Sequence, residues 1–453
     1  MTVRLEELSG RLSGSVTLAG DPDWDVARRA WNLAVEQRPA AVVYPESAAD
    51  IAAIVDLARE GGLGIAFNGG GHNAGPIDWA DDVLLVKTER MRGIAIAAEA
   101  RRARIEAGVL ADQLAAAAGE HGLAYLAGTS PDAGVIGYAL GGGLSWMVRL
   151  HGLAVNTIAA VELVTADGEI RRVDERSEPD LFWAVRGGGG NFGAVTALEL
   201  ELIPLTEIYA GCLFWPIERS REVFVAWRDW IEGVPEACES LVRIFKLPDI
   251  PDVPDHLRAR SFALVEVAYV GAEADGASLV APLRARGPEF DTIASIPPSA
   301  LSTVNMDPPY PVPYHGEGIH LADFPVEAID AALGVMLDSP LMHFEVRHLG
   351  GAASRRSPRH GALGCVPWPF TMMAFGLALD GEMKRVMEVE IALLLETLRP
   401  WDSGFRYLNF AESEMDARLI FPPESYERLR QVKATYDPSD VFRANHRIPP
   451  ASA

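Results

Sequence analysis

Residues 181–196 read LFWAVRGGGGNFGAVT. Within this stretch, residues 188–193 match the GxGxxG pattern of loops that bind dinucleotides. In a Rossmann fold that pattern lies between a strand and a following helix, because the diphosphate meets the N-terminus of the helix. Here the periodicity predicts the reverse order, with a short helix over residues 179–185 and a strand over residues 194–202. The stretch therefore argues against a Rossmann site.

Two further glycine-rich loops precede this one in the chain. Residues 68–73 read NGGGHN, and residues 134–143 read GVIGYALGGG. Glycine allows positive φ and close backbone approach, and successive exposed amide groups form a nest that suits a diphosphate. A tight turn is the ordinary explanation of any one such loop. Three such loops in one part of the chain are less easily explained as independent turns.

Short strands and helices alternate through the first part of the chain. Ser47 begins a predicted helix as part of a capping box, and the pair Gly61 and Gly62 ends it. The buried residues of this helix should be Ile51, Ile54, Val55 and either Leu57 or Ala58. Other predicted strands cover residues 41–44, 64–67, 83–86, 104–106 and 157–165, and another helix covers residues 111–118. Pro-interrupted stretches follow Leu205, and compact segments return from about residue 405, so domain boundaries are expected at both points.

The composition indicates a globular chain with an acidic surface. Its 453 residues are 49% hydrophobic, enough for two or three cores, and the formal net charge is -23. This charge would repel a polyphosphate, so no nucleic acid partner is expected. An anionic substrate would need a local cluster of cations, and the sequence reveals none. No apolar run is long enough for a membrane span and the N-terminus lacks a signal-peptide pattern, so we expect a cytoplasmic protein with no membrane partner.

The cysteines and the paired histidines give no metal or disulfide signal. Cys212, Cys238 and Cys365 are scattered along the chain, which favours buried thiols over disulfides. His315 with His320 and His343 with His348 are each five residues apart, a spacing that fits neither HExxH nor one face of a helix. We therefore expect no metal site. Other pocket candidates, for which ordinary packing is the more common role, are Tyr310, Tyr314 and His360.

Four stretches together resemble the berberine bridge enzyme-like FAD-linked oxidoreductases of the vanillyl-alcohol oxidase group, whose FAD-binding domain is of the PCMH type. Residues 68–72 resemble the family's RSGGH loop, with Asn68 and Gly69 in place of Arg-Ser. Residues 128–143, GTSPDAGVIGYALGGG, resemble GTCPTVGVGGxxLGGG. Residues 181–196 follow LFWALRGGGGNFGVVT almost residue for residue, and residues 436–445 resemble YDPxNxFRxN. The resemblance covers residues 40–205 and 405–449.

This resemblance implies an α+β fold with two domains. Residues 1–205 and 405–453 would together form a split FAD-binding domain of the PCMH type. Residues 206–404 would form an inserted substrate-binding domain built on an antiparallel sheet. We expect the active site where the two meet.

The resemblance also implies how FAD is held. The family's loop histidine bonds to the 8α-methyl group of the flavin, so His72 is the expected attachment point. Ser130 stands where members with two covalent bonds have a cysteine, which leaves a single histidyl link. A hydrogen-bonding His72 without a covalent bond is the alternative. Further expected FAD contacts are Asn68, Gly69, Gly70, Gly71, Asn73, Thr129, Ser130, Asp132, Ala133, Gly137, Tyr138, Gly142, Gly143, Gly193, Val195, Tyr407, Asn409 and Asn445. Arg447 replaces the second Asn of the family's closing NxNI, which leaves that contact open.

The expected reaction is hydride transfer from a small organic substrate to flavin N5. Tyr407, in a segment that resembles the family's YxNY, is the candidate base, and packing against the flavin is its alternative role. Tyr138 is expected to face the cofactor and shape the pocket. Ala133 lies where small side chains admit O2 in relatives, so we expect an oxidase that releases H2O2. The alternatives are a dehydrogenase with another acceptor, a flavin-binding protein without turnover, and a nicotinamide-dependent reductase. The expected substrate is an alcohol, sugar, amine or secondary metabolite, and a homo-oligomer is left open.

Overall fold

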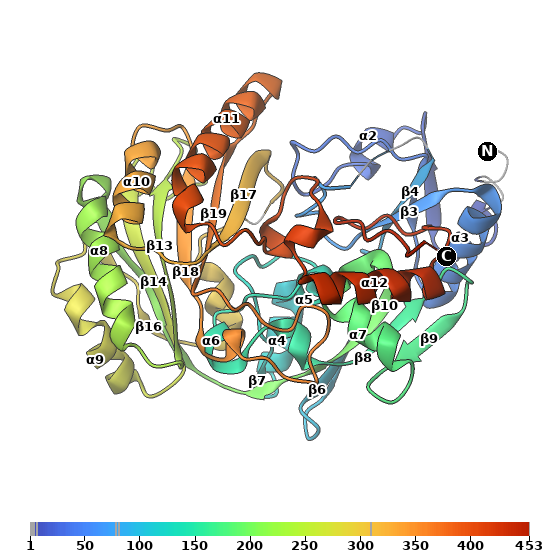
Figure 1. Ribbon diagram of the computed structural model, residues 1–453, viewed down its shortest axis with the longest axis horizontal. Coiled ribbons are helices and arrows are strands. Elements are labelled where there is room, and N and C mark those ends of the chain that lie inside the picture. Colours follow the sequence, from blue (N-terminus) through green and yellow to red (C-terminus); the bar gives the residue numbers. More distant parts are fainter. Residues whose placement is uncertain (1–4, 6–7, 78, 80–81, 309, 453) are drawn as a thin grey trace.

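The computed structural model describes residues 5, 8–77, 79, 82–308 and 310–452, and Figure 1 shows its mixture of helices and sheets. Two sheets are built mainly from the N-terminal part of the chain. A four-stranded sheet has the order β1 (Ser15–Leu18), β2 (Ala41–Tyr44), β4 (Val83–Lys87) and β3 (Gly64–Asn68). A five-stranded antiparallel sheet has the order β5 (Ile94–Ala97), β6 (Arg102–Glu106), β10 (Ala194–Glu201), β8 (Ile158–Val164) and β9 (Ile170–Val173).

Helix α3 (Ala48–Gly61) packs against strands of both sheets. The hydroxyl of Ser47 accepts a hydrogen bond from the backbone N of Asp50 at 3.1 Å, and Gly62 ends the helix with φ 67°. The apolar side chains predicted for its inner face, including Leu57 and Ala58, are all buried. The sequence prediction of this helix is confirmed, because both of its ends depend on local backbone chemistry.

The second glycine-rich loop differs from its prediction. Residues 135–140 form helix α5 (Val135–Leu140), which begins after Gly134. Val135, Ala139 and Leu140 are buried in the core, and this burial explains why the segment coils into a helix despite its glycines. The predicted order around residues 188–193 is confirmed, since helix α7 (Pro179–Gly188) precedes them and strand β10 follows.

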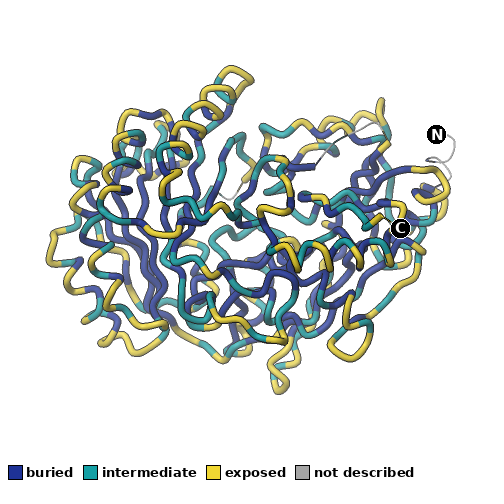
Figure 2. Tube along the Cα trace, in the orientation of Figure 1, coloured by how far each residue is buried: buried dark blue, intermediate teal, exposed yellow. Residues whose placement is uncertain are grey.

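The middle of the chain forms a large antiparallel sheet. Its order is β15 (Phe290–Asp291), β12 (Ile208–Pro216), β14 (Ser261–Tyr269), β13 (Cys238–Lys246), β18 (His343–His348), β19 (Phe370–Leu377) and β17 (Tyr314–Leu321), with β16 (Ala294–Ile296) paired to β12. One face is covered by helices, and Figures 1 and 2 show these partly exposed helices over buried strands: α8 (Ser220–Trp230), α9 (Glu273–Arg284), α10 (Val326–Met336) and α11 (Gly381–Leu398). Trp227 and Phe344 lie in the core between these layers.

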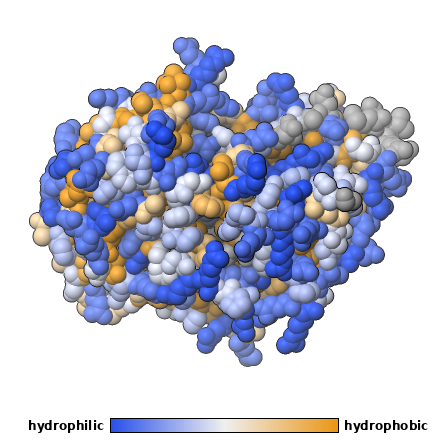
Figure 3. Space-filling model, in the orientation of Figure 1, coloured by the Kyte–Doolittle hydropathy of each residue, from blue (hydrophilic) through white to orange (hydrophobic). Residues whose placement is uncertain are grey.

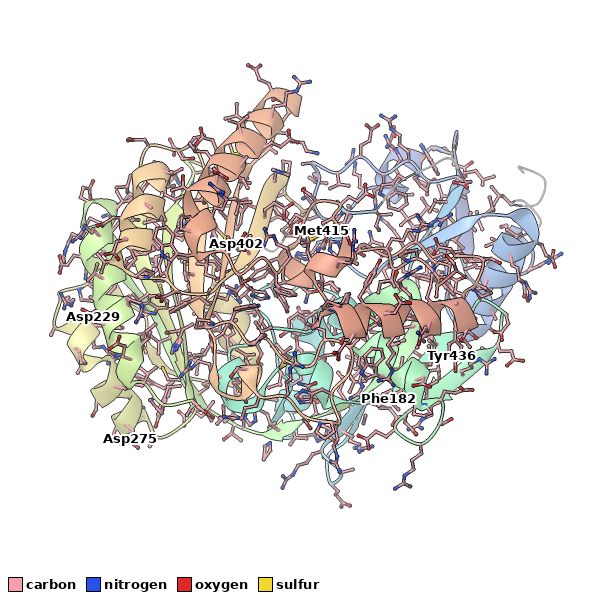
Figure 4. The ribbon with its side chains drawn as sticks, in the orientation of Figure 1. Phe182, Asp229, Asp275, Asp402, Met415 and Tyr436 are labelled. Atoms are coloured by element: carbon pink, nitrogen blue, oxygen red, sulfur yellow. The ribbon has the colours of Figure 1, made fainter. Side chains whose placement is uncertain are left out.

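The C-terminal segment returns to the N-terminal sheets. The backbone N and O of Ile65 in β3 bond to Val441 and Arg443, each at 2.8 Å. Helix α12 (Pro423–Tyr436) lies against α7, and Figure 4 shows Tyr436 and Phe182 on these neighbouring helices. Side chains of this segment, including Phe421 and Phe442, belong to the same core as the N-terminal elements. The mixed helix and sheet class expected from the sequence is confirmed.

The surface and the cysteines complete the description of the fold. Figure 3 shows a mostly hydrophilic face, with hydrophobic side chains gathered near α11. Cys212 and Cys238 are buried as predicted, whereas Cys365 is half-buried. None of the helices formed by the described residues is both long and apolar enough to cross a membrane.

Candidate active site

A cavity of about 1200 Å³ opens between the glycine-rich loops and the large sheet. Its volume exceeds the roughly 300–1000 Å³ of most ligand pockets, so it has room for a large cofactor beside a small substrate. One part is lined by residues 68–74, 128–130, 133–138, 140–141, 188–191, 193 and 195 together with residues 443–446. The other part is lined by strands β13, β18, β19 and β17 and by residues 305–308.

His72 is held in place at the edge of this cavity. Its Nε2 lies 3.0 Å from Oδ1 of Asp132, and the indole of Trp31 stacks on its ring with centroids 4.1 Å apart. The indole N–H of Trp31 donates to the other oxygen of Asp132. Burial alone would raise the pKa of Asp132, but the hydrogen bond and charge of His72 and the bond from Trp31 lower it. Asp132 is therefore a carboxylate that fixes the His72 ring.

The first two glycine loops pack backbone against backbone. A Cβ on Gly134 would lie 2.8 Å from the carbonyl oxygen of Gly69, and a Cβ on Gly70 would lie 3.2 Å from the N of Gly134. Gly71 has φ 89°, a conformation that favours glycine. In contrast, a Cβ on Gly137 or Gly190 would meet no atom within 4 Å. These open glycines leave backbone accessible to a ligand in the cavity.

Several buried polar atoms on the cavity wall have no protein partner. They are both amide atoms of Gln37, Oδ1 of Asn73 and the hydroxyl of Tyr125. Buried polar groups are nearly always hydrogen-bonded in proteins, so such a set indicates a polar ligand. Together with the open glycine backbone, this donor and acceptor set fits a large polar cofactor such as FAD.

Tyr407 lies where the two parts of the cavity meet. It precedes the short helix η8 (Leu408–Phe410), and only 1% of it is exposed. Its hydroxyl oxygen accepts hydrogen bonds from the backbone N of Leu144 at 2.9 Å and from Nδ2 of Asn409 at 3.2 Å. Burial raises the pKa of Tyr407 to about 12, although these donors and the charge of Arg347 oppose the rise. With two N–H donors on its oxygen, the hydroxyl is arranged to stabilise a phenolate.

Tyr138 lines the same cavity but is bonded differently. Its hydroxyl donates to the carbonyl oxygen of Leu126 at 2.9 Å, and burial raises its pKa well above the usual value. Its ring lies close to Gly128 and Gly143, where an added Cβ would come within 2.8 Å and 3.0 Å of it. These contacts suit a side chain that shapes the pocket rather than one that moves a proton.

The sheet contributes a wall of charged side chains. On β18, Glu345 lies 2.6 Å from Nε of Arg347 and 3.2 Å from Nε2 of His343. On the neighbouring strands, Arg243 of β13 and Glu266 of β14 form a buried ion pair at 2.6 Å. Burial lowers the pKa of His343, and burial raises that of Glu266 to about 7.

The structure brings most of the predicted site residues to one cavity. The lining contains all of them except Asp132, which bonds His72, and Gly142 and Gly143, which pack behind Tyr407 and Tyr138. Tyr310 and Tyr314 also line the cavity, whereas His360 is not among its lining residues. Arg447 forms an ion pair with Asp440.

Sequence reasoning missed the stacking of Trp31 on His72 and the arrangement of charged side chains on the large sheet. Trp31 lies in a segment without periodicity, which gave no signal. Strand β18 did carry a sequence signal. Its polar residues His343, Glu345 and Arg347 alternate with apolar Phe344 and Val346. Such alternation is typical of a strand with one polar face.

Comparisons with known proteins support an FAD-binding domain in this chain. A family model described as an FAD binding domain matches residues 39–174, and one described as berberine and berberine like matches residues 406–449. The chain is 29% identical to (R)-6-hydroxynicotine oxidase of Paenarthrobacter nicotinovorans over 467 residues, covering 97% of both chains. It is 34% identical to glucooligosaccharide oxidase of Sarocladium strictum over 216 residues, covering 46% of this chain and 43% of that protein.

A solved structure shares the fold over nearly the full length. The crystal structure of 6-hydroxy-D-nicotine oxidase from Arthrobacter nicotinovorans matches with a TM-score of 0.81 and 26% identity. The match covers 97% of this chain and 98% of that one.

Proposed function

Because the chain belongs to the berberine bridge enzyme-like FAD-linked oxidoreductases, we propose that it carries FAD on a single covalent bond to His72 and oxidises a small organic molecule. The observation that carries this proposal is the position of His72 at the edge of a cavity that extends to Tyr407. Nε2 of the imidazole is hydrogen-bonded to Asp132, so Nδ1 is the nitrogen left to form the covalent bond to FAD. Ser130 has no thiol for a second bond.

The covalent bond has a direct test. After acid precipitation of the purified protein, a yellow pellet is expected for the parent and a colourless pellet for His72→Ala. An exposed histidine, His121→Ala, is the matched control and should give a yellow pellet. Yellow colour that stays in the parent's supernatant would refute the covalent link and leave bound FAD as the coarser conclusion.

We propose Tyr407 as the group that accepts the substrate's proton. Bound FAD supplies the hydride acceptor, at N5 of its ring system. Loss of a hydride from a carbon that bears a hydroxyl or amine leaves a proton to be removed. Tyr407 lines the cavity, and because burial raises its pKa to about 12 it can accept this proton only after it has become a phenolate. The Leu144 N–H, the Asn409 amide and the charge of Arg347 would stabilise that phenolate. Tyr138, whose hydroxyl is already bonded to Leu126, would shape the pocket instead.

We propose that O2 reoxidises the enzyme and that H2O2 is released. Ala133, a small side chain on the cavity lining, supports this choice over a dehydrogenase. Reduced enzyme mixed with air-saturated buffer should recover its yellow colour within seconds in a stopped-flow experiment. Recovery over minutes would favour the dehydrogenase. Absence of bleaching with a broad panel of alcohols, sugars, amines and phenols would favour a flavin-binding protein without turnover.

The domain division is also a proposal. The hydrophobic core that contains Ile65 and Leu198 also contains Phe421 and Phe442, and the core under α8, α10 and α11 is separate. These cores support a split FAD-binding domain, residues 1–205 and 405–453, around residues 206–404. A cytoplasmic location remains a prediction, which cell fractionation would test.

A further inference from the structure

Arg347 has donors that nothing in the protein uses. Its Nε donates to Oε1 of Glu345 at 2.6 Å, and its guanidinium lies over the ring of Phe410, 5.1 Å from the centroid. Only 11% of the side chain is exposed, and it lines the cavity. Among the described residues, Nη1 and Nη2 have no hydrogen-bond partner. Neither nitrogen is among the fully buried unpartnered atoms, so both are open to a ligand in the cavity.

The acidic side chains in this region lie close to donors of the protein. The oxygens of Glu345 face Arg347 Nε and His343 Nε2, and those of Asp307 accept from Ser130 at 2.5 Å and Asn305 at 2.6 Å. Glu266 lies 2.6 Å from Arg243. Oε2 of Glu345 and both carboxylate oxygens of Glu266 lack hydrogen-bond partners, so the case for a bound anion rests on the unused Nη groups of Arg347.

Burial further reduces the negative charge in this region. Burial raises the pKa of Glu239 to about 8 and that of Glu266 to about 7, and burial also raises the pKa of Glu412 to about 8. Glu239 and Glu412 are then mostly neutral at pH 7, whereas Arg347 stays charged. The chain thus provides locally the cation that an anionic ligand needs against its overall net charge of -23.

We propose that Arg347 binds a carboxylate of the substrate, so that the substrate is a small organic acid with an oxidisable hydroxyl or amine. A planar guanidinium fork matches a carboxylate through two parallel hydrogen bonds. Glu345 holds the fork by Nε, which leaves the Nη face free. This inference rests on the proposed function for the oxidation itself, and the binding adds no chemical step.

The position of Arg347 limits the size of the substrate. The guanidinium carbon of Arg347 lies 5.1 Å from the ring centre of Phe410, and the ring centre of Tyr407 also lies 5.1 Å from it. The guanidinium carbon and the phenol ring are therefore at most about 10 Å apart, and the carboxylate should lie within that distance of the carbon that is oxidised.

Three isosteric probes test the proposal without turnover. Benzoate, benzamide and benzylamine share one aromatic ring, which suits the neighbouring Phe245 and Phe375 of the cavity wall, and differ in the charge of the attached group. Their dissociation constants are measured by the shift of thermal unfolding on the purified protein, with flavin absorbance as a second readout. We expect benzoate to bind about 10- to 100-fold more tightly than benzamide, and benzylamine to bind most weakly.

Variants of Arg347 test whether this residue causes the preference for benzoate over benzamide. Arg347→Gln should reduce the ratio of benzamide to benzoate dissociation constants to about one, and Arg347→Lys should keep part of it because the charge stays. Arg221→Gln, which removes an exposed arginine paired with Asp330, should leave the ratio unchanged. If Arg347→Gln does not fold, Arg347→Lys must show the partial loss on its own.

The proposal is overturned if benzamide or benzylamine binds as tightly as benzoate, if no probe binds, or if the Arg347 variants keep the full preference. Thermal unfolding reports binding whether or not flavin is attached or reduced. Failure of the carboxylate preference is therefore distinguishable from failure of the proposed oxidation, which the acid-precipitation and reoxidation experiments detect.

Discussion

Replacement of Asp132 by Asn should slow the attachment of FAD without preventing it. The carboxylate of Asp132 accepts from Trp31 and lies 3.0 Å from Nε2 of His72. As Nδ1 of His72 forms its bond, the ring gains positive charge, which a carboxylate stabilises better than an amide. A hydrogen bond to a charged group contributes roughly 1.5–3 kcal/mol and a neutral one roughly 0.5–1.5 kcal/mol. The difference, about 1–1.5 kcal/mol, corresponds to about a tenfold slower attachment.

The rate can be measured on apoprotein mixed with FAD. Samples are precipitated with acid at intervals, and the flavin absorbance of the redissolved pellet gives the covalent fraction. Asp56→Asn is the matched control, because Asp56 is exposed and pairs with Arg59 away from the cavity. Equal rates for Asp132→Asn and the parent would refute the role of Asp132. A complete loss of attachment in Asp132→Asn with normal thermal stability would mean that the effect is far larger than a single hydrogen bond.

Three other substitutions test the site and the fold. Tyr407→Phe should lower kcat/KM about 100- to 10,000-fold while the covalent flavin content is unchanged, and a loss below tenfold in steady-state assays would exclude it as the proton acceptor. Lys433→Met should lower the free energy of unfolding in urea by about 3–5 kcal/mol, because it leaves Asp437, 2.6 Å from Lys433 Nζ and fully buried, without its cation. An unchanged urea midpoint would contradict this. Burial lowers the pKa of His320 from 6.5 to about 3, so the unfolded state binds a proton in that range that the folded state does not. Stability should therefore fall with acidification below pH 6.5, by about 1.4 kcal/mol per pH unit for this proton, and His320→Gln should remove that part of the slope. Equal slopes for variant and parent would show that His320 titrates normally.

The features that the sequence predicted correctly are those determined by local chemistry. The ends of α3 follow from Ser47 and Gly62 alone, and the order of helix, glycines and strand around residues 188–193 follows from periodicity. The same reasoning failed over residues 135–140, where tertiary burial of apolar side chains favours a helix over a glycine-rich loop.

The charged wall could not be located from the sequence because it depends on strand pairing. Arg243 lies opposite Glu345 in the register of β13 and β18, although about 100 residues separate them. Alternation within residues 343–348 indicates a polar face but not which strand lies beside it. Asp132 shows a related limit. The resemblance implied an FAD contact, whereas in the structure its carboxylate bonds His72 and Trp31.

The packing of the C-terminal segment explains how Tyr407 is held where the two parts of the cavity meet. Residues 407–410 lie between the glycine loops and the large sheet. On each side they contact a glycine that a larger residue could not replace without a clash. A Cβ on Gly141 would lie 1.8 Å from Oδ1 of Asn409, and one on Gly318 would lie 2.7 Å from Cβ of Phe410. Neither glycine has a positive φ, so each is required for space and not for backbone conformation. The segment is clamped from both sides, and the hydroxyl of Tyr407 is consequently fixed by backbone packing before any substrate binds. Such preorganisation would avoid the cost of moving Tyr407, the proposed proton acceptor, into place during the reaction.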